Sequence, residues 1–170
     1  MKVKILRLGH RKKRDKRLTT HVALIARAFG ADEVIICGER DDSLIKTVKD
    51  VVKRWGGPFE ISYSKNWKKT LNDLADNYTI VHLTMYGMPF EKALNKLKGK
   101  NLVVIVGSEK VPSDVYKLAD YNLSVTNQPH SEAGALAVFL YELFSGKKKR
   151  FKDYKIKIKP SKRGKKVIKK

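Results

Sequence analysis

The stretch NLVVIVGSEKVP, residues 101–112, decides the fold class, because an unbroken apolar run ends there in a glycine and a polar loop. A strand without polar alternation is covered on both faces, which is typical of a parallel sheet in an α/β protein. Residues 121–125 form a second predicted strand, and the polar loop TNQPHSE follows it at residues 126–132. Ligands of parallel sheets bind at the carboxyl ends of the strands, so we expect the two loops to form a cofactor pocket. Either loop alone would also fit an ordinary turn between a strand and a helix.

Strand-like and helix-like segments alternate about six times along the whole chain, which predicts one α/β domain at residues 1–146. The predicted strands are 2–8, 34–37, 59–63, 79–84, 102–106 and 121–125. The first predicted helix begins at Thr19 or Thr20, and the others cover 43–55, 67–74, 90–97, 112–119 and 131–144. We expect a mostly parallel sheet with helices on both faces. The last helix has almost no polar face, which fits either complete burial in the monomer or an interface between subunits.

Positive charge dominates the composition, with 38 Lys and Arg residues against 17 Asp and Glu and a formal net charge of +21. A chain this basic is expected to bind a polyanion, and RNA, DNA and an anionic membrane surface are the candidates. Residues 147–170 hold fourteen of the basic residues and one acid, Asp153. Alternating residues at 154–159, followed by turn residues at 160–164, predict a small basic β-hairpin in this extension. The alternative is a disordered basic tail.

Several familiar classes of protein do not fit the sequence. It has no apolar run of eighteen residues, so we expect no membrane span, and no signal-peptide pattern, so we expect a cytoplasmic protein. A single cysteine, Cys37, allows no internal disulfide, and the four histidines lack metal-ligand spacing, so we expect no metal. The glycine-rich dinucleotide motif, the P-loop and the G-x-S-x-G motif are missing too.

A pocket of strand-end loops beside a basic surface suits a cofactor that contains adenosine. Leu83, Val111 and Val125 could form an apolar wall for the adenine ring. Glu109 could pair with an ammonium or sulfonium charge of the cofactor, or form a salt bridge with Lys110.

Four motifs extend this interpretation: RLGHRxxRDxRxTTH at residues 7–21, HLTMYG at 82–87, VGSEKVP at 106–112 and NQPHSE at 127–132. In this order they closely resemble the archaeal tRNA methyltransferases that modify the ribose 2′-hydroxyl of the T-loop cytidine at position 56, a family of the SPOUT superfamily. The resemblance covers essentially the whole chain. It implies a C-terminal trefoil knot, S-adenosylmethionine bound in that knot, tRNA as substrate, and a homodimer whose sites lie near the subunit interface.

The resemblance also implies roles for particular residues. Arg14 and Arg17 would act on the target, and we favour Arg17, because a guanidinium can grip the phosphate beside the ribose with two hydrogen bonds. Arginine is a poor general base, so His130 and His21 are candidates for that role, against ordinary roles in a loop and at a helix start. The implied cofactor-binding residues are Leu83, Gly107, Ser108, Glu109, Lys110, Val111, Val125, Thr126, Asn127, Gln128, Pro129, His130, Ser131 and Glu132.

The sequence departs from the family pattern at Lys12, Ser108, Thr126 and Gly134, where Pro, Ala, Gly and Ala are expected. The basic loop at residues 11–17 and the basic extension would hold the tRNA backbone, which gives affinity but little choice of base. Two alternatives stay open: another SPOUT methyltransferase with a different RNA target, and an RNA-binding module without catalytic activity.

Overall fold

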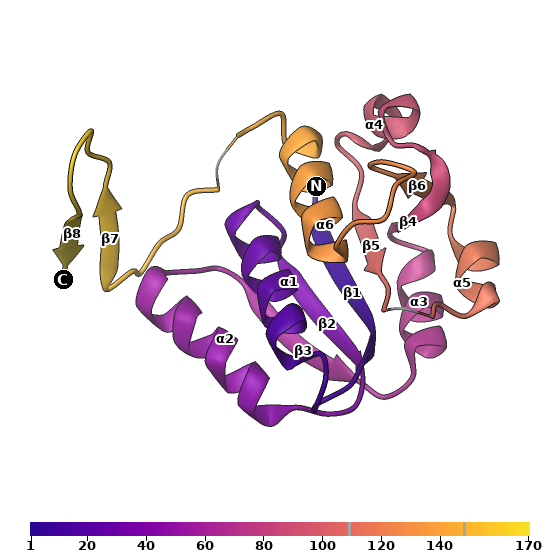
Figure 1. Cartoon of the computed structure of the whole chain (residues 1–170), viewed down its shortest axis with the longest axis horizontal. Coiled ribbons are helices and arrows are strands. Elements are labelled where there is room, and N and C mark those ends of the chain that lie inside the picture. Colours follow the sequence, from indigo (N-terminus) through magenta and orange to yellow (C-terminus); the bar gives the residue numbers. More distant parts are fainter. Residues whose placement is uncertain (109, 148) are drawn as a thin grey trace.

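The computed structural model describes residues 1–108, 110–147 and 149–170, and in them one sheet of six strands lies between two layers of helices (Figure 1). A separate hairpin of two strands stands away from this body at the C-terminal end. The elements in chain order are β1 (Val3–His10), α1 (Lys16–Ala28), β2 (Glu33–Gly38), α2 (Asp42–Trp55), β3 (Glu60–Ser64), α3 (Trp67–Ala75), β4 (Thr79–Pro89), α4 (Glu91–Leu97), β5 (Leu102–Val106), α5 (Ser113–Leu118), β6 (Tyr121–Ser124), α6 (Glu132–Leu143), β7 (Ile156–Lys159) and β8 (Lys166–Lys169).

The sheet has the strand order β3-β2-β1-β5-β4-β6, and all of these neighbours pair in parallel. The predicted α/β fold with a parallel sheet is therefore confirmed. β6 pairs with β4 and lies beyond it from β5, so the chain crosses β4 before α6 returns to pack on α1. This pairing of strands that are not consecutive fits the trefoil knot that the resemblance implies, and the knot itself stays a prediction.

Both faces of the sheet are buried, which explains why β5 shows no polar alternation. Leu102, Val104 and Val106 pack into the apolar layer that includes α1, α2, α4 and α6, whereas Val103 and Ile105 pack into the layer beneath α3 and α5. All five side chains are fully buried. Removing an aliphatic side chain of this size from water contributes about 1.5 to 3 kcal/mol, so the central strand anchors both layers.

Two predicted bounds are wrong by three residues or more, and tertiary contacts explain both. α1 begins at Lys16 rather than at Thr19 or Thr20, because the Thr19 hydroxyl is buried against Arg7 instead of capping a helix. β4 continues to Pro89, because its last residues pair with β6. Gly87 permits this close approach, since a Cβ there would lie 2.6 Å from backbone atoms of Leu123.

The C-terminal extension contains the predicted hairpin, in which β7 and β8 pair antiparallel. An isolated pair of strands is marginally stable, but the segment that leads to β7 is attached to the body. Arg27 stacks on the Phe151 ring at 4.0 Å and donates a hydrogen bond of 2.6 Å to the Gly56 carbonyl. Lys152 forms a backbone bridge with Gly57. The alternative of a disordered tail is therefore wrong for this structure, and the domain boundary after residue 146 stays a prediction.

Candidate functional site

A pocket of about 270 Å³ lies at the carboxyl ends of β4 and β5, beside the start of α6. This is the edge of a parallel sheet at which ligands usually bind. Among the described residues, the pocket is lined by His82, Leu83, Thr84, Met85, Tyr86, Gly107, Ser108, Val111, Tyr116, Val125, His130, Glu132 and Ala135.

The structure brings together half of the cofactor residues that the sequence predicts: Leu83, Gly107, Ser108, Val111, Val125, His130 and Glu132. The described lining does not include Lys110, Thr126, Asn127, Gln128, Pro129 or Ser131, and Glu109 lies outside the described residues. Two of the predicted residues outside this lining, Asn127 and Ser131, form structural hydrogen bonds instead. Asn127 donates hydrogen bonds to the carbonyls of Met85 and Gly87, and the Ser131 hydroxyl accepts one from Ala133 N at the start of α6.

Polar residues that were not among the predicted cofactor-binding residues occupy another wall of the pocket. The Thr84 and Tyr116 hydroxyls lie 3.1 Å apart, and the Tyr116 ring meets His82 edge to face at 4.7 Å. His82 Nδ1 lies 2.9 Å from Asn122 Oδ1, and burial lowers the pKa of this histidine, which favours the neutral ring. The HLTMYG motif pointed to His82 and Thr84, but Tyr116 carries no sequence signal because α5 must fold back to place it.

A second hollow contains the arginines with predicted catalytic roles. Lys13, Arg14, Lys16, Arg17, Thr20, His21 and Thr47 line it, from the loop after β1, from α1 and from α2. Cations at the start of a helix, where backbone N–H groups point outward, suit a phosphate. In the described part of the chain no residue lines both hollows, so one subunit does not bring Arg14 and Arg17 into the cofactor pocket. Of the histidine candidates, His130 lies in the pocket and His21 in the basic hollow.

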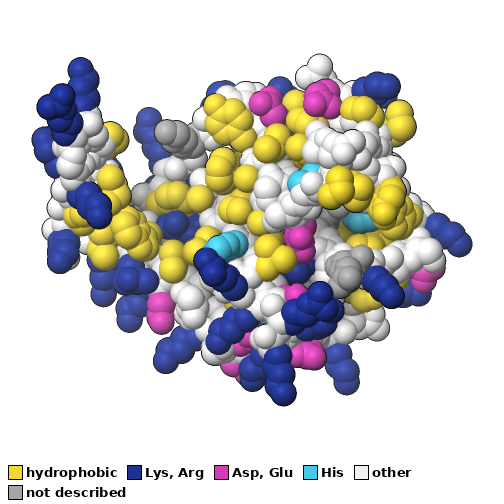
Figure 2. Space-filling model, viewed as in Figure 1, with side chains coloured by type: hydrophobic (Ala, Val, Ile, Leu, Met, Phe, Trp, Pro, Cys, Tyr) yellow, Lys and Arg dark blue, Asp and Glu magenta, His cyan; other side chains and the backbone are white. Residues whose placement is uncertain are grey.

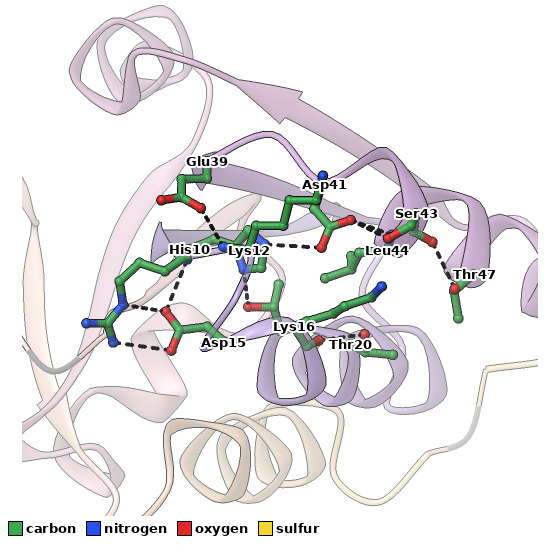
Figure 3. A network of polar contacts seen from close by, with 12 residues as sticks. His10, Lys12, Asp15, Lys16, Thr20, Glu39, Asp41, Ser43, Leu44 and Thr47 are labelled. Atoms are coloured by element: carbon green, nitrogen blue, oxygen red, sulfur yellow. Dashed lines mark hydrogen bonds and ion pairs between the residues drawn. The ribbon is translucent and has the colours of Figure 1, made fainter.

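Carboxylates hold the basic loop in place (Figure 3). Asp15 accepts two hydrogen bonds from the Arg11 guanidinium, at 2.8 and 3.2 Å, and hydrogen bonding to this side chain lowers the pKa of the Asp15 carboxyl. Glu39 accepts a hydrogen bond of 2.7 Å from Lys12 N. Figure 2 shows Lys and Arg side chains along the lower edge of the molecular face that it draws, and over the hairpin. The loop thus presents a positive surface from a fixed backbone.

The described residues contain neither a cluster of three or more metal-binding side chains nor a helix long and apolar enough to cross a bilayer.

The fold is similar to that of solved SpoU methyltransferases. AviRb from Streptomyces viridochromogenes, solved in complex with AdoMet, superposes with a TM-score of 0.61 at 14% identity over 84% of this chain and 56% of its own. The TrmH/SpoU tRNA modifying enzyme of A. aeolicus gives 0.62 at 12% identity over 85% of this chain and 74% of its own. The chain thus spans little more than half of AviRb, and at these identities the likeness establishes the fold alone.

Sequence similarity identifies the family. A family model described as tRNA ribose 2′-O-methyltransferase, aTrm56, matches residues 55–168. The tRNA (cytidine(56)-2′-O)-methyltransferase of Thermococcus kodakarensis is 55% identical over 98% of this chain and 96% of its own length. The enzyme of the same name from Pyrococcus horikoshii is also 55% identical, over 96% of this chain and 83% of its own. The chain belongs to the aTrm56 family of tRNA ribose 2′-O-methyltransferases.

Proposed function

We propose that this protein methylates the ribose 2′-hydroxyl of cytidine 56 in tRNA, with S-adenosylmethionine as methyl donor. The observation that carries the proposal is the 55% identity, over nearly the whole chain, to relatives named for this reaction. The pocket at the carboxyl ends of β4 and β5 supports it. A tRNA substrate also favours a cytoplasmic location.

The residues of the pocket fit the cofactor. Leu83, Val111 and Val125 provide apolar surface for an adenine ring, and the carbonyl and N–H groups of the strand-end loops can read its edge. Glu132 brings a carboxylate to the same pocket, which suits a ligand with sulfonium and ammonium charges. When bound, S-adenosylmethionine supplies an electrophilic methyl group on sulfur.

Catalysis would depend mainly on positioning. A ribose hydroxyl is a weak nucleophile, and holding it in line with the methyl donor removes much of the entropic barrier. Arg17, exposed at the start of α1, would grip the neighbouring phosphate through two N–H groups, which Lys could not reproduce. The hydroxyl oxygen would form the new bond to the methyl carbon while the bond from that carbon to the donor sulfur breaks, which leaves a neutral thioether as the leaving group. The hydroxyl proton would pass to a base, for which His130 in the pocket is the candidate.

A homodimer would bring the two hollows together. α6 buries Leu136, Phe139 and Leu140 but leaves Val138 and Tyr141 about half exposed, at 45% and 52%, so complete burial in the monomer is wrong. An apolar helix face of this kind fits contact with a second copy. We infer that Arg17 of one subunit reaches the cofactor pocket of the other.

Two assays test the reaction itself. The protein is incubated with unmodified tRNA and S-adenosylmethionine, and nuclease fragments are analysed by mass spectrometry. We expect 2′-O-methylcytidine at position 56, and no product from a tRNA whose ribose 56 is 2′-deoxy. A methyl group on a base or at another site would favour a different SPOUT methyltransferase. Absence of cofactor binding in calorimetry would favour an RNA-binding module.

A mixing experiment tests the role of Arg17. Arg17→Ala should abolish turnover and keep cofactor affinity, whereas Arg40→Ala, at an exposed arginine paired with Asp42, should leave both unchanged. Val125→Trp should fill the pocket and also abolish turnover. Refolding the two inactive variants together yields mixed dimers, and a site shared between subunits would restore about a quarter of the activity. No recovery would place Arg17 in the site of its own subunit.

A further inference from the structure

Arg7 is a charged side chain enclosed in the body of the protein. It lies on β1, between apolar Leu6 and Leu8, and its side chain has no exposed surface. Burial lowers the pKa of the guanidinium, and the negative charges of Glu132 and Asp15 oppose this shift. Burying a charge away from water costs several kcal/mol unless polar partners surround it, so the contacts of Arg7 show which groups stabilise its charge.

The contacts of Arg7 reach two walls of the cofactor pocket from behind. Its Nη1 donates to the Gly107 carbonyl, at the end of β5, and to the Leu8 carbonyl at 3.3 Å. Its Nη2 lies 3.2 Å from Glu132 Oε1, at the start of α6. Gly107 and Glu132 both line the pocket, and the described lining does not include Arg7. One guanidinium therefore joins two pocket walls that are distant in sequence.

The contact with Glu132 is an ion pair without hydrogen-bond geometry. Within the described residues, Arg7 Nη2 is buried and has no hydrogen-bond partner. The Glu132 side chain is 27% exposed, so its carboxylate faces both the buried arginine and the pocket. A cation bound in the pocket would interact with the same carboxylate.

A second set of contacts links Arg7 to the basic surface. Its Nε donates to Thr19 Oγ1 at 3.3 Å, and the same hydroxyl lies 2.9 Å from His10 Nδ1. His10 Nε2 lies 3.7 Å from the Asp41 carboxylate, and both side chains are fully buried. Thr19 is on the inner side of α1, whereas Arg17 lines the basic hollow. Arg7 thus contacts the helix that presents the basic hollow as well as the pocket walls.

We propose that Arg7 is a positioning residue of the methyl transfer, which fixes Glu132 and the Gly107 carbonyl in the pocket wall and so sets the affinity for the cationic cofactor. The inference rests on the proposed function, because the pocket must take S-adenosylmethionine. Arg7 acts through Glu132 and the Gly107 loop and does not contact the cofactor.

Calorimetry on a double-mutant cycle tests the proposal. Arg7→Met and Glu132→Gln should each raise the Kd for S-adenosylmethionine about tenfold, and the double variant should lose much less than the product of the two effects. Arg7→Lys, which keeps the charge, should recover part of the affinity. S-adenosylhomocysteine, which lacks the sulfonium charge, should lose less affinity in Glu132→Gln. Lys4→Met, which replaces another basic residue of β1 and breaks its ion pair with Glu33 of β2, is the matched control and should bind normally.

Hydrogen exchange without cofactor gives a readout that does not depend on the proposed function. Arg7→Met should speed exchange about tenfold at the first hydrogen-bonded amides of α6, from Ala135 onward, and at the amides near the end of β5. The amides of β2 should exchange as in the wild type. If this pattern appears but no variant binds S-adenosylmethionine, the proposed function fails and the positioning of the pocket wall by Arg7 stands.

Two results would overturn the proposal. Effects of Arg7→Met and Glu132→Gln that multiply independently would show that the two side chains do not act together. A fall in thermal stability with unchanged Kd, in both Arg7→Met and Arg7→Lys, would show that Arg7 only supports the fold. Should Arg7→Met fail to fold, Arg7→Lys and the Glu132→Gln exchange pattern decide between these outcomes.

Discussion

Neutralising four lysines at the tip of the β7–β8 hairpin should flatten the salt dependence of tRNA binding. Lys159, Lys162, Lys165 and Lys166 are exposed and lie at or between the ends of the two strands. Each phosphate contact contributes about 0.7 to 0.9 to the slope of log K against log salt, so four contacts contribute about 3. Replacing all four with Gln should reduce the slope by up to that amount.

Fluorescence anisotropy with labelled tRNA measures the effect. Between about 0.05 and 0.2 M salt, a slope difference of 3 corresponds to about a 60-fold difference in how much affinity is lost. The variant should therefore bind less tightly than the wild type at low salt, and the two should converge as salt rises.

A control variant separates contact from net charge. Lys92, Lys96, Lys98 and Lys100 are four exposed lysines on and just after α4, which Figure 1 places at the opposite side of the molecule from the hairpin. Changing these four to Gln removes the same charge and should leave the slope nearly unchanged. Equal slopes for the wild type and the hairpin variant would refute the contact. An equal reduction in both variants would mean that net charge alone acts.

Three further predictions concern the body of the protein. Gly87→Ala should cost about 1 to 3 kcal/mol in thermal unfolding, because its Cβ would lie 2.6 Å from the Leu123 backbone; an unchanged Tm would contradict the close approach. Burial lowers the pKa of His10, so the stability that its neutral form provides is present above pH 6.5 and is lost as the pH falls below that value. His10→Asn should therefore shrink the drop in Tm between about pH 7.5 and 5.5. An undiminished drop would show that His10 is not its cause. Burial raises the pKa of the Cys37 thiol to about 12, so a disulfide reagent at pH 8 should react after unfolding; rapid reaction of the folded protein would refute this.

The order of strands and helices could be predicted because each element carries its own signal. β5 is apolar throughout since both of its faces are buried, and α2 shows an amphipathic pattern because one side faces solvent. The start of α1 could not be read in this way. Thr19 has the side chain of a helix cap, but its hydroxyl contacts Arg7, which is twelve residues earlier in the chain. The length of β4 depends likewise on β6, which follows about thirty residues later.

The residues of the candidate site also fall into two groups, those that a local sequence signal predicts and those that only tertiary contacts bring into place. Leu83, Gly107 and Val125 follow from the rule that ligands bind at strand ends, and the structure places all three in the pocket. Tyr116 enters only because α5 folds across the end of β4. Arg7 resembles the other basic residues of an alternating strand, and its burial depends on α1, β5 and α6 together.

The attachment of the hairpin bears on how such a basic protein could select one nucleotide. Phosphate contacts supply affinity without reading bases, so the net charge of +21 does not explain a preference for position 56. The stacking of Arg27 on Phe151 and the bridge between Gly57 and Lys152 hold the extension against the body before tRNA arrives, so binding need not order that segment again. A positive surface fixed relative to the pocket can then recognise the shape of folded tRNA. On this reasoning, Phe151→Ala should reduce the preference for folded over unfolded tRNA more than it reduces binding of either at low salt, and an unchanged preference would refute the role of the attachment.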